Sequence, residues 1–167
     1  DGGYQHPDYW SEAGWQWLSQ QRAGSVPRSC TGIAPDQPRA CVTWYEAEAY
    51  CNWLNLSAAG QHYKPIGMRA RLPTREQWML AARNGKISAS SDEMDYPWAG
   101  PFDPALANTK ESNLRQTTPV DMYLNGATPN GVCDLAGNVW EWTASAYDKD
   151  RDAFWLNGGS WYCYPDW

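Results

Sequence analysis

The sequence predicts an α+β fold that is rich in loops, with two to three helices and few short strands. Apolar residues recur at helical spacing in the first half of the chain, up to Gly85. After that residue Gly, Pro and Asn divide the chain into short segments, and no long helical pattern returns. Helices followed by short strands are typical of α+β architectures. We expect a single domain over residues 1–167.

Three segments carry the signals of helices. Residues 8–22 are amphipathic, with an apolar side formed by Trp10, Trp15 and Leu18. The other two helices begin with capping boxes, in which a Thr hydroxyl meets a free backbone amide and an acid or amide side chain reaches back. These boxes are Thr43-Trp44-Tyr45-Glu46 and Thr74-Arg75-Glu76-Gln77. Their predicted buried stripes are Trp44, Ala47, Cys51 and Leu54 in the second helix, and Trp78, Ala81 and Ala82 in the third.

The remaining segments are predicted as loops and strands. Residues 23–40 are rich in Gly, Pro and Ser, which indicates a loop, and Gly85 is expected to end the third helix. The best strand candidates lie around residues 139–143 and 153–161.

Composition excludes several classes of function. The net charge is −6 with acidic and basic residues interspersed, so a nucleic-acid partner is not expected. No apolar run approaches the roughly 20 residues that span a bilayer. The 12 Trp and 10 Tyr against 2 Phe favour aromatic side chains with a polar group, either as large core residues or as a recognition surface.

The five cysteines do not form a zinc pattern. No CxxC pair occurs, and the sequence has only two histidines. Cys30 and Cys41 flank a Pro-rich loop and could form a disulfide in an oxidising compartment. Cys51 lies on an apolar helix face, where a buried thiol is expected.

Four segments occur in the order found in a known family: Val42–Cys51, Arg71–Trp78, Gly131–Trp142 and Asn157–Trp161. With them the chain resembles the formylglycine-generating-enzyme family, also called the sulfatase-modifying-factor family. The resemblance covers nearly the whole chain and implies a C-type-lectin-like fold. Members usually carry further segments at both ends, so we expect a domain that lacks its usual N-terminal and C-terminal segments.

The resemblance implies a calcium site in the Gly-Asn-Val-Trp-Glu-Trp segment. By position, Asp134 and Glu141 would supply carboxylates, and Gly137 and Val139 would supply backbone carbonyls. Calcium takes six to eight oxygen ligands, and two acids that bracket a Gly-containing turn can converge on one ion. The alternative is a turn Asp and a surface Glu. A second calcium site of the family would involve Asn108.

The same resemblance places Cys163 where the first of two active-site cysteines falls in the family's copper-dependent oxidases. Those enzymes convert a sulfatase cysteine to formylglycine, and Cu(I) prefers thiolate ligands. Tyr164 stands where a His is usual, and Pro165 to Trp167 also differ from the enzyme pattern. The alternative is an incidental cysteine.

The stretch from Trp161 to Trp167 also resembles the variable region of proteins diversified by retroelements, some of which are related to this family. Exposed Tyr and Trp bring large contact area at small entropic cost. The expected ligand-binding residues are Tyr162, Cys163, Tyr164 and Trp167. The alternative is that these side chains pack against a further C-terminal segment.

These observations favour a calcium-stabilised, lectin-like ligand-binding module that displays an aromatic turn to a protein or other extracellular ligand. The alternative is a copper-dependent formylglycine-generating oxidase that acts on a sulfatase peptide. Ergothioneine-type sulfoxide synthases share the lectin-like part, but two scattered histidines argue against their iron chemistry. A location outside the cytoplasm or at the cell surface is slightly favoured.

Overall fold

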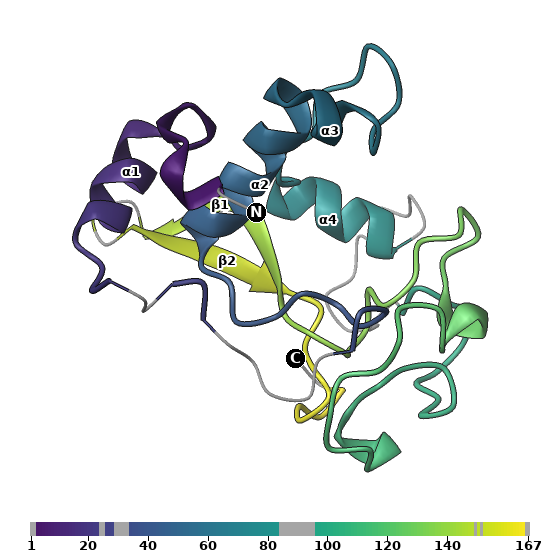
Figure 1. Cartoon of the computed structure of the whole chain (residues 1–167). Coiled ribbons are helices and arrows are strands. Elements are labelled where there is room, and N and C mark those ends of the chain that lie inside the picture. Colours follow the sequence, from purple (N-terminus) through teal and green to yellow (C-terminus); the bar gives the residue numbers. More distant parts are fainter. Residues whose placement is uncertain are drawn as a thin grey trace. The chain divides into compact units, whose positions relative to one another are not determined.

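The computed structural model describes residues 3–23, 26–28, 34–83, 96–148, 150 and 152–165. It is rich in loops, with short helices and one small sheet, which confirms the predicted α+β class (Figure 1). The chain divides into two compact units. Unit 1 comprises Asp1–Cys30 and Cys41–Leu72, and unit 2 comprises Thr31–Ala40 and Pro73–Trp167.

Unit 1 is helical. Its elements are η1 (Gly3–Gln5), η2 (Pro7–Tyr9), α1 (Glu12–Ser19), α2 (Trp44–Leu56) and α3 (Ala58–Gln61). The helix predicted over residues 8–22 is shorter, because the Ser11 hydroxyl caps α1 by accepting the Gly14 amide at 3.2 Å. The residues before it form the 3-10 turn η2, which begins at a proline.

The predicted capping box of α2 is confirmed. The Glu46 amide donates to the Thr43 hydroxyl, and the Thr43 amide donates to Glu46 Oε2 at 2.7 Å. Glu46 is buried, and its other oxygen accepts a hydrogen bond from the Tyr4 hydroxyl at 2.6 Å, which lowers the cost of burying the carboxyl group. The predicted stripe of Trp44, Ala47, Cys51 and Leu54 is only partly buried, whereas Ala49 is buried.

Stacked aromatic rings pack α1 against α2. Trp17 lies between Trp10 and Tyr45, with ring centroids 6.2 and 5.6 Å away. Trp15, which was expected on the apolar side of this helix, is 37% exposed. Cys41 is in a disulfide, as the predicted pair requires, and Cys30 lies outside the described residues.

Unit 2 contains α4 (Arg75–Ala82), the 3-10 turns η3 (Lys110–Ser112) and η4 (Leu124–Gly126), and the strands β1 (Glu141–Asp148) and β2 (Ala153–Asn157). The second predicted capping box is confirmed at the start of α4. Trp78 and Ala82 pack with Leu135 in the core of this unit, but Ala81 is exposed. Gly85, the predicted end of α4, lies outside the described residues.

The two strands are antiparallel, and α4 packs against both. Glu141 pairs with Asn157, and Trp142 pairs with Leu156. Two irregularities follow before Asp148 pairs with Ala153, so β1 is longer than its partner. The predicted strands around residues 139–143 and 153–161 are therefore confirmed with shifted ends.

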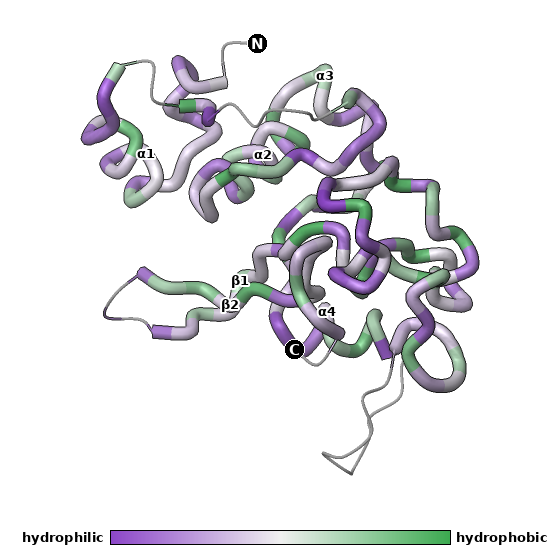
Figure 2. Tube along the Cα trace, turned by 90° about the horizontal axis from the view of Figure 1, so that it is seen from below, coloured by the Kyte–Doolittle hydropathy of each residue, from purple (hydrophilic) through white to green (hydrophobic). Residues whose placement is uncertain are grey.

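Loops make up most of the described residues between α4 and β1, drawn in teal to green in Figure 1. Hydrophilic and hydrophobic residues alternate over short stretches of the trace (Figure 2). Within the described residues no helix has the length and apolar character needed to cross a membrane.

Candidate functional site

The turn from Asp134 to Asn138 determines where the two predicted calcium-binding acids lie. Asp134, Gly137 and Asn138 have φ angles of 57, 87 and 61°. This left-handed region suits Gly and is tolerated by Asn and Asp. A Cβ atom at Gly137 would collide with the Asn108 carbonyl, since the two residues form a β-bridge. The close approach of these two segments therefore requires glycine.

Asp134 and Glu141 lie close enough for their charges to interact. The pKa of Glu141 is raised to about 7, chiefly because the carboxyl group is buried. A 2.7 Å hydrogen bond from Trp78 Nε1 to Glu141 Oε2 opposes this rise, and the Asp134 charge contributes to it. Burial also raises the pKa of Asp134, against a hydrogen bond from Asn138. The two acids thus share an environment that disfavours two uncompensated negative charges.

Asn138 is a fully buried residue that lies between the two acids in the chain. Its Nδ2 donates to the Thr118 carbonyl at 3.2 Å and to Asp134 Oδ2 at 3.1 Å. Its Oδ1 accepts the Thr118 amide at 3.0 Å. Its backbone amide donates to the Asn108 carbonyl at 2.8 Å, and its carbonyl accepts the Trp161 amide at 3.1 Å. Residues 134–141, which contain both acids, are called the acidic turn below. Asn138 therefore connects the acidic turn by hydrogen bonds to the loops that contain Asn108, Thr118 and Trp161.

Asn108 is buried against the acidic turn as well. Its Nδ2 donates to the Gln116 carbonyl at 2.9 Å and to Asn138 Oδ1 at 3.3 Å. Its Oδ1 accepts the Ser112 hydroxyl at 3.0 Å. The structure therefore places this predicted ligand beside the other predicted ligands, with its side-chain oxygen engaged by a serine.

The described residues contain no cluster of three or more His, Cys, Asp or Glu side chains suited to a metal ion. The predicted calcium ligands include two acids, and backbone carbonyls would have to complete the site. Val139 is partly buried and lies between Gly137 and Glu141 in the chain.

Cys163 lies in a tight turn that follows β2. Its amide donates to the Ser160 carbonyl at 2.9 Å, and its Sγ lies 3.2 Å from the Ser160 hydroxyl. Its carbonyl accepts the Lys110 amide at 3.0 Å. The thiol is partly buried and free. This turn is connected to the acidic turn through the bond between Trp161 and Asn138.

Two tyrosines flank this thiol on the surface. Tyr162 is 58% exposed and Tyr164 is 56% exposed. The Lys110 ammonium lies 3.9 Å from the centroid of the Tyr164 ring, a cation–π contact. Trp167, the remaining predicted ligand-binding residue, lies outside the described residues.

Sequence reasoning named the two acids and the thiol but missed three residues that position them. Asn138 lies in one of the four ordered motifs, but nothing in the adjacent sequence indicates its bonds to segments twenty or more residues away. Lys110 and Ser160 form hydrogen bonds with Cys163 and so position the turn of residues 160–163, called the thiol turn below. The Gly-Asn pair at positions 137 and 138 indicated a turn, because both residue types are common in turns, but it did not indicate the partners of the Asn138 side chain.

The chain that forms these two turns matches a known family over its whole length. Residues 1–167 match the family described as "Sulfatase-modifying factor enzyme 1-like domain". The chain belongs to this family.

Relatives with three different names match the chain. The chain is 34% identical to the inactive C-alpha-formylglycine-generating enzyme 2 of Bos taurus, over 87% of the chain and 46% of the bovine protein. It is 33% identical to the hercynine oxygenase of Mycobacterium tuberculosis, over 99% of the chain and 42% of that protein. It is 33% identical to the formylglycine-generating enzyme of Bos taurus, over 76% of the chain and 32% of that protein.

The chain spans less than half the length of these relatives. The hercynine oxygenases of Mycolicibacterium thermoresistibile and Mycolicibacterium smegmatis are 36% and 33% identical to the chain, each over 87% of it.

Proposed function

We propose that the chain forms the thiol-bearing part of a formylglycine-generating-type oxidase that acts on a cysteine in a sulfatase peptide. The observation that carries the proposal is the placement of Cys163. Its free thiol sits in a turn held by Ser160, by the Lys110 amide and by Asn138 through Trp161. Similarity to formylglycine-generating enzymes supports the same function.

Copper(I) is the cofactor that this family resemblance implies, and the described residues fit it only in part. Thiolates are suitable ligands for Cu(I). Cys163 supplies one such ligand, whereas Cys51 belongs to unit 1 and Cys133 is a separate thiol that precedes the acidic turn. Cys163 is therefore proposed as one copper-binding thiol, and the second thiolate is not assigned.

Calcium is proposed as a structural ion at the acidic turn. Asp134 and Glu141 would bind it through carboxylates, and Gly137 and Val139 through carbonyls. The support is electrostatic: burial raises the pKa of both acids, and a divalent cation would compensate their charges. A second ion at Asn108 stays a prediction, and it would require exchange of the hydrogen bond from Ser112.

A second candidate function is ligand binding without catalysis, in a lectin-like fold. It is favoured by the exposure of Tyr162 and Tyr164 on either side of Cys163. Exposed tyrosines are common anchors in recognition surfaces. Diversification by a retroelement would act on these positions together with Trp167. An inactive relative in the same family is compatible with this function.

One assay separates the two candidates. The protein that carries this chain is loaded with Cu(I) and incubated in air with a peptide that contains Cys-X-Pro-X-Arg. Binding is followed by fluorescence anisotropy, and the aldehyde product by hydrazide capture and mass spectrometry. The oxidase predicts aldehyde that accumulates over many turnovers. Peptide that binds but is recovered unchanged would favour the binding module, and binding should then weaken when Tyr162 and Tyr164 are both changed to Ser.

A further inference from the structure

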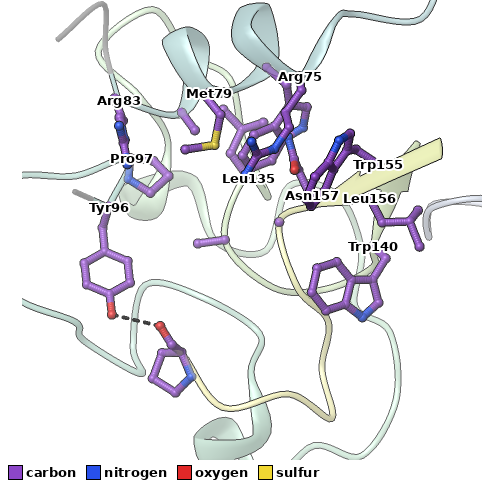
Figure 3. A pocket seen from close by; sticks show the side chains of 15 residues that line it. Arg75, Met79, Arg83, Tyr96, Pro97, Leu135, Trp140, Trp155, Leu156 and Asn157 are labelled. Carbon is purple, nitrogen blue, oxygen red and sulfur yellow. Dashed lines mark hydrogen bonds between the residues drawn. The ribbon is translucent and has the colours of Figure 1, made fainter. Parts of the chain in front are cut away.

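A cavity of about 340 Å³ lies within unit 2, between α4, β2 and the segment that contains Tyr96 and Pro97. Arg75, Trp155 and Asn157 lie together on one side of it, across from Tyr96 and Pro97 (Figure 3). Its volume is at the lower end of the range found for small-molecule sites. The cavity is therefore large enough for a ligand about the size of an aromatic amino acid.

Two hydrogen-bond donors in the residues that line this cavity have no partner. They are Arg75 Nε and Asn157 Nδ2, and both atoms are buried. The Asn157 side chain is 7% exposed, so solvent does not satisfy it. A buried donor without a partner costs about 1–3 kcal/mol, which makes two of them in one cavity unusual. A ligand with acceptor oxygens would remove this cost.

The charges around the cavity indicate which acceptor fits. Arg75 and Arg83 line it, and no Asp or Glu is among the described residues that do so. Glu141, which pairs with Asn157 across the strands, already accepts the Trp78 indole N–H. Arginine next to an amide donor is suited to a carboxylate, which can accept two hydrogen bonds at once.

The walls of the cavity are aromatic. Trp78, Trp140 and Trp155 contribute large rings, and pocket surfaces of this kind bind flat apolar groups. The Arg75 guanidinium lies 4.1 Å from the centroid of the Trp155 ring, which holds the arginine against the wall. A ligand could thus place its polar group at Arg75 and its flat apolar group against the neighbouring tryptophan rings.

We propose that this cavity binds a small aromatic carboxylate, whose oxygens accept hydrogen bonds from Arg75 Nε and Asn157 Nδ2 and whose ring packs against the tryptophans. The carboxylate belongs either to a free small molecule or to the C-terminus of a peptide that ends in an aromatic residue. This binding site goes beyond the oxidase function and does not depend on it.

Calorimetric titration of the unaltered protein tests the chemistry directly. Phenylacetate is compared with phenylacetamide, which has the same shape without the negative charge. The cavity predicts that phenylacetate binds at least tenfold more tightly, a difference of about 1.4 kcal/mol. Equal affinities, or no binding of either compound at millimolar concentration, would overturn the proposal. A peptide with a C-terminal Phe, as acid and as amide, then identifies the source of the carboxylate.

Two variants test the assigned donors. Arg75→Lys keeps the positive charge but removes Nε, and Asn157→Leu removes Nδ2 at similar volume. Each should weaken phenylacetate binding about tenfold and phenylacetamide binding less, because a hydrogen bond to a charged acceptor is stronger than one to a neutral amide oxygen. Arg71→Lys, at an exposed position in unit 1, is the matched control and should bind as the unaltered protein does. Unchanged affinity in both donor variants would contradict the assignment.

Discussion

Asn138 holds the acidic turn in place through its side chain and its backbone. It bonds to Asn108, Thr118, Asp134 and Trp161, and no part of it is exposed. A buried side-chain amide stabilises the fold when all its hydrogen bonds are formed. If the amide is removed, each former partner is a buried polar group without a hydrogen bond, and each carries a desolvation cost.

Replacing Asn138 with Ala should therefore lower the free energy of unfolding by about 3 kcal/mol. Urea denaturation measures the change. Asn113→Ala is the matched control, because Asn113 has a similar φ of 55° but is exposed. We expect that control to cost less than about 1 kcal/mol. Similar losses in both variants would show that the left-handed backbone, and not the buried hydrogen bonds, determines the effect.

The raised pKa of Glu141 predicts that the stability of the calcium-free protein depends on pH in an unusual way. Its pKa is raised from 4.5 to about 7 in the folded state, so the native state binds a proton that the unfolded state has lost. Its contribution to stability is present below pH 4.5 and is lost as the pH rises toward 7. The expected loss is of order 3 kcal/mol.

Urea unfolding in EDTA at several pH values checks this. Glu141→Gln should remove the loss, and Asp150→Asn, at an exposed acid of the same unit, should leave it unchanged. The same slope in the Glu141→Gln variant would mean that other groups cause the pH dependence.

At the scale of elements, the acidic turn and the loop around Asn108 can approach closely because Gly137 has no side chain. Gly137→Ala should cost about 3 kcal/mol or more, since the added methyl collides with the Asn108 carbonyl and the φ of 87° is strained for Ala.

Gly131→Ala separates the two causes, because Gly131 has a φ of 80° but no atom near the position of its Cβ. It should lose only the conformational part, about 1 kcal/mol. Comparable thermal unfolding of the two variants would contradict the close approach.

The starts of α2 and α4 were predictable from sequence, whereas the start of α1 and parts of the packing faces were not. Both capping boxes are local devices read from four consecutive residues, and both are present. Trp15 and Ala81 were expected on buried faces but are exposed, because the side that a helix buries depends on which segments pack against it. Asn138 shows the same limit at the site, since its partners lie in other loops.

At the scale of the whole molecule, the family and the loop-rich α+β class followed from the four ordered motifs and are confirmed. The expectation of one domain remains a prediction, and so does the lectin-like label. The division into two compact units was not foreseen, because it depends on long-range contacts that no local pattern records.

Calcium should raise the stability of the whole chain if it binds the acidic turn. The melting temperature is expected to increase with calcium concentration, because an ion that binds only the folded state shifts the unfolding equilibrium. Differential scanning calorimetry with calcium and with EDTA measures the shift, and Glu141→Gln should abolish most of it. A melting temperature that does not respond to chelation would exclude the proposed ion.

The central claim is that the Cys163 thiol is required for oxidation of a substrate cysteine. The most direct measurement is the rate of aldehyde formation from the Cys-X-Pro-X-Arg peptide by the Cys163→Ser variant, with Cys133→Ser, another partly buried free thiol, as the control. We predict that turnover disappears in Cys163→Ser while the peptide still binds, and that Cys133→Ser keeps the activity of the unaltered protein. Undiminished turnover in Cys163→Ser would contradict the claim.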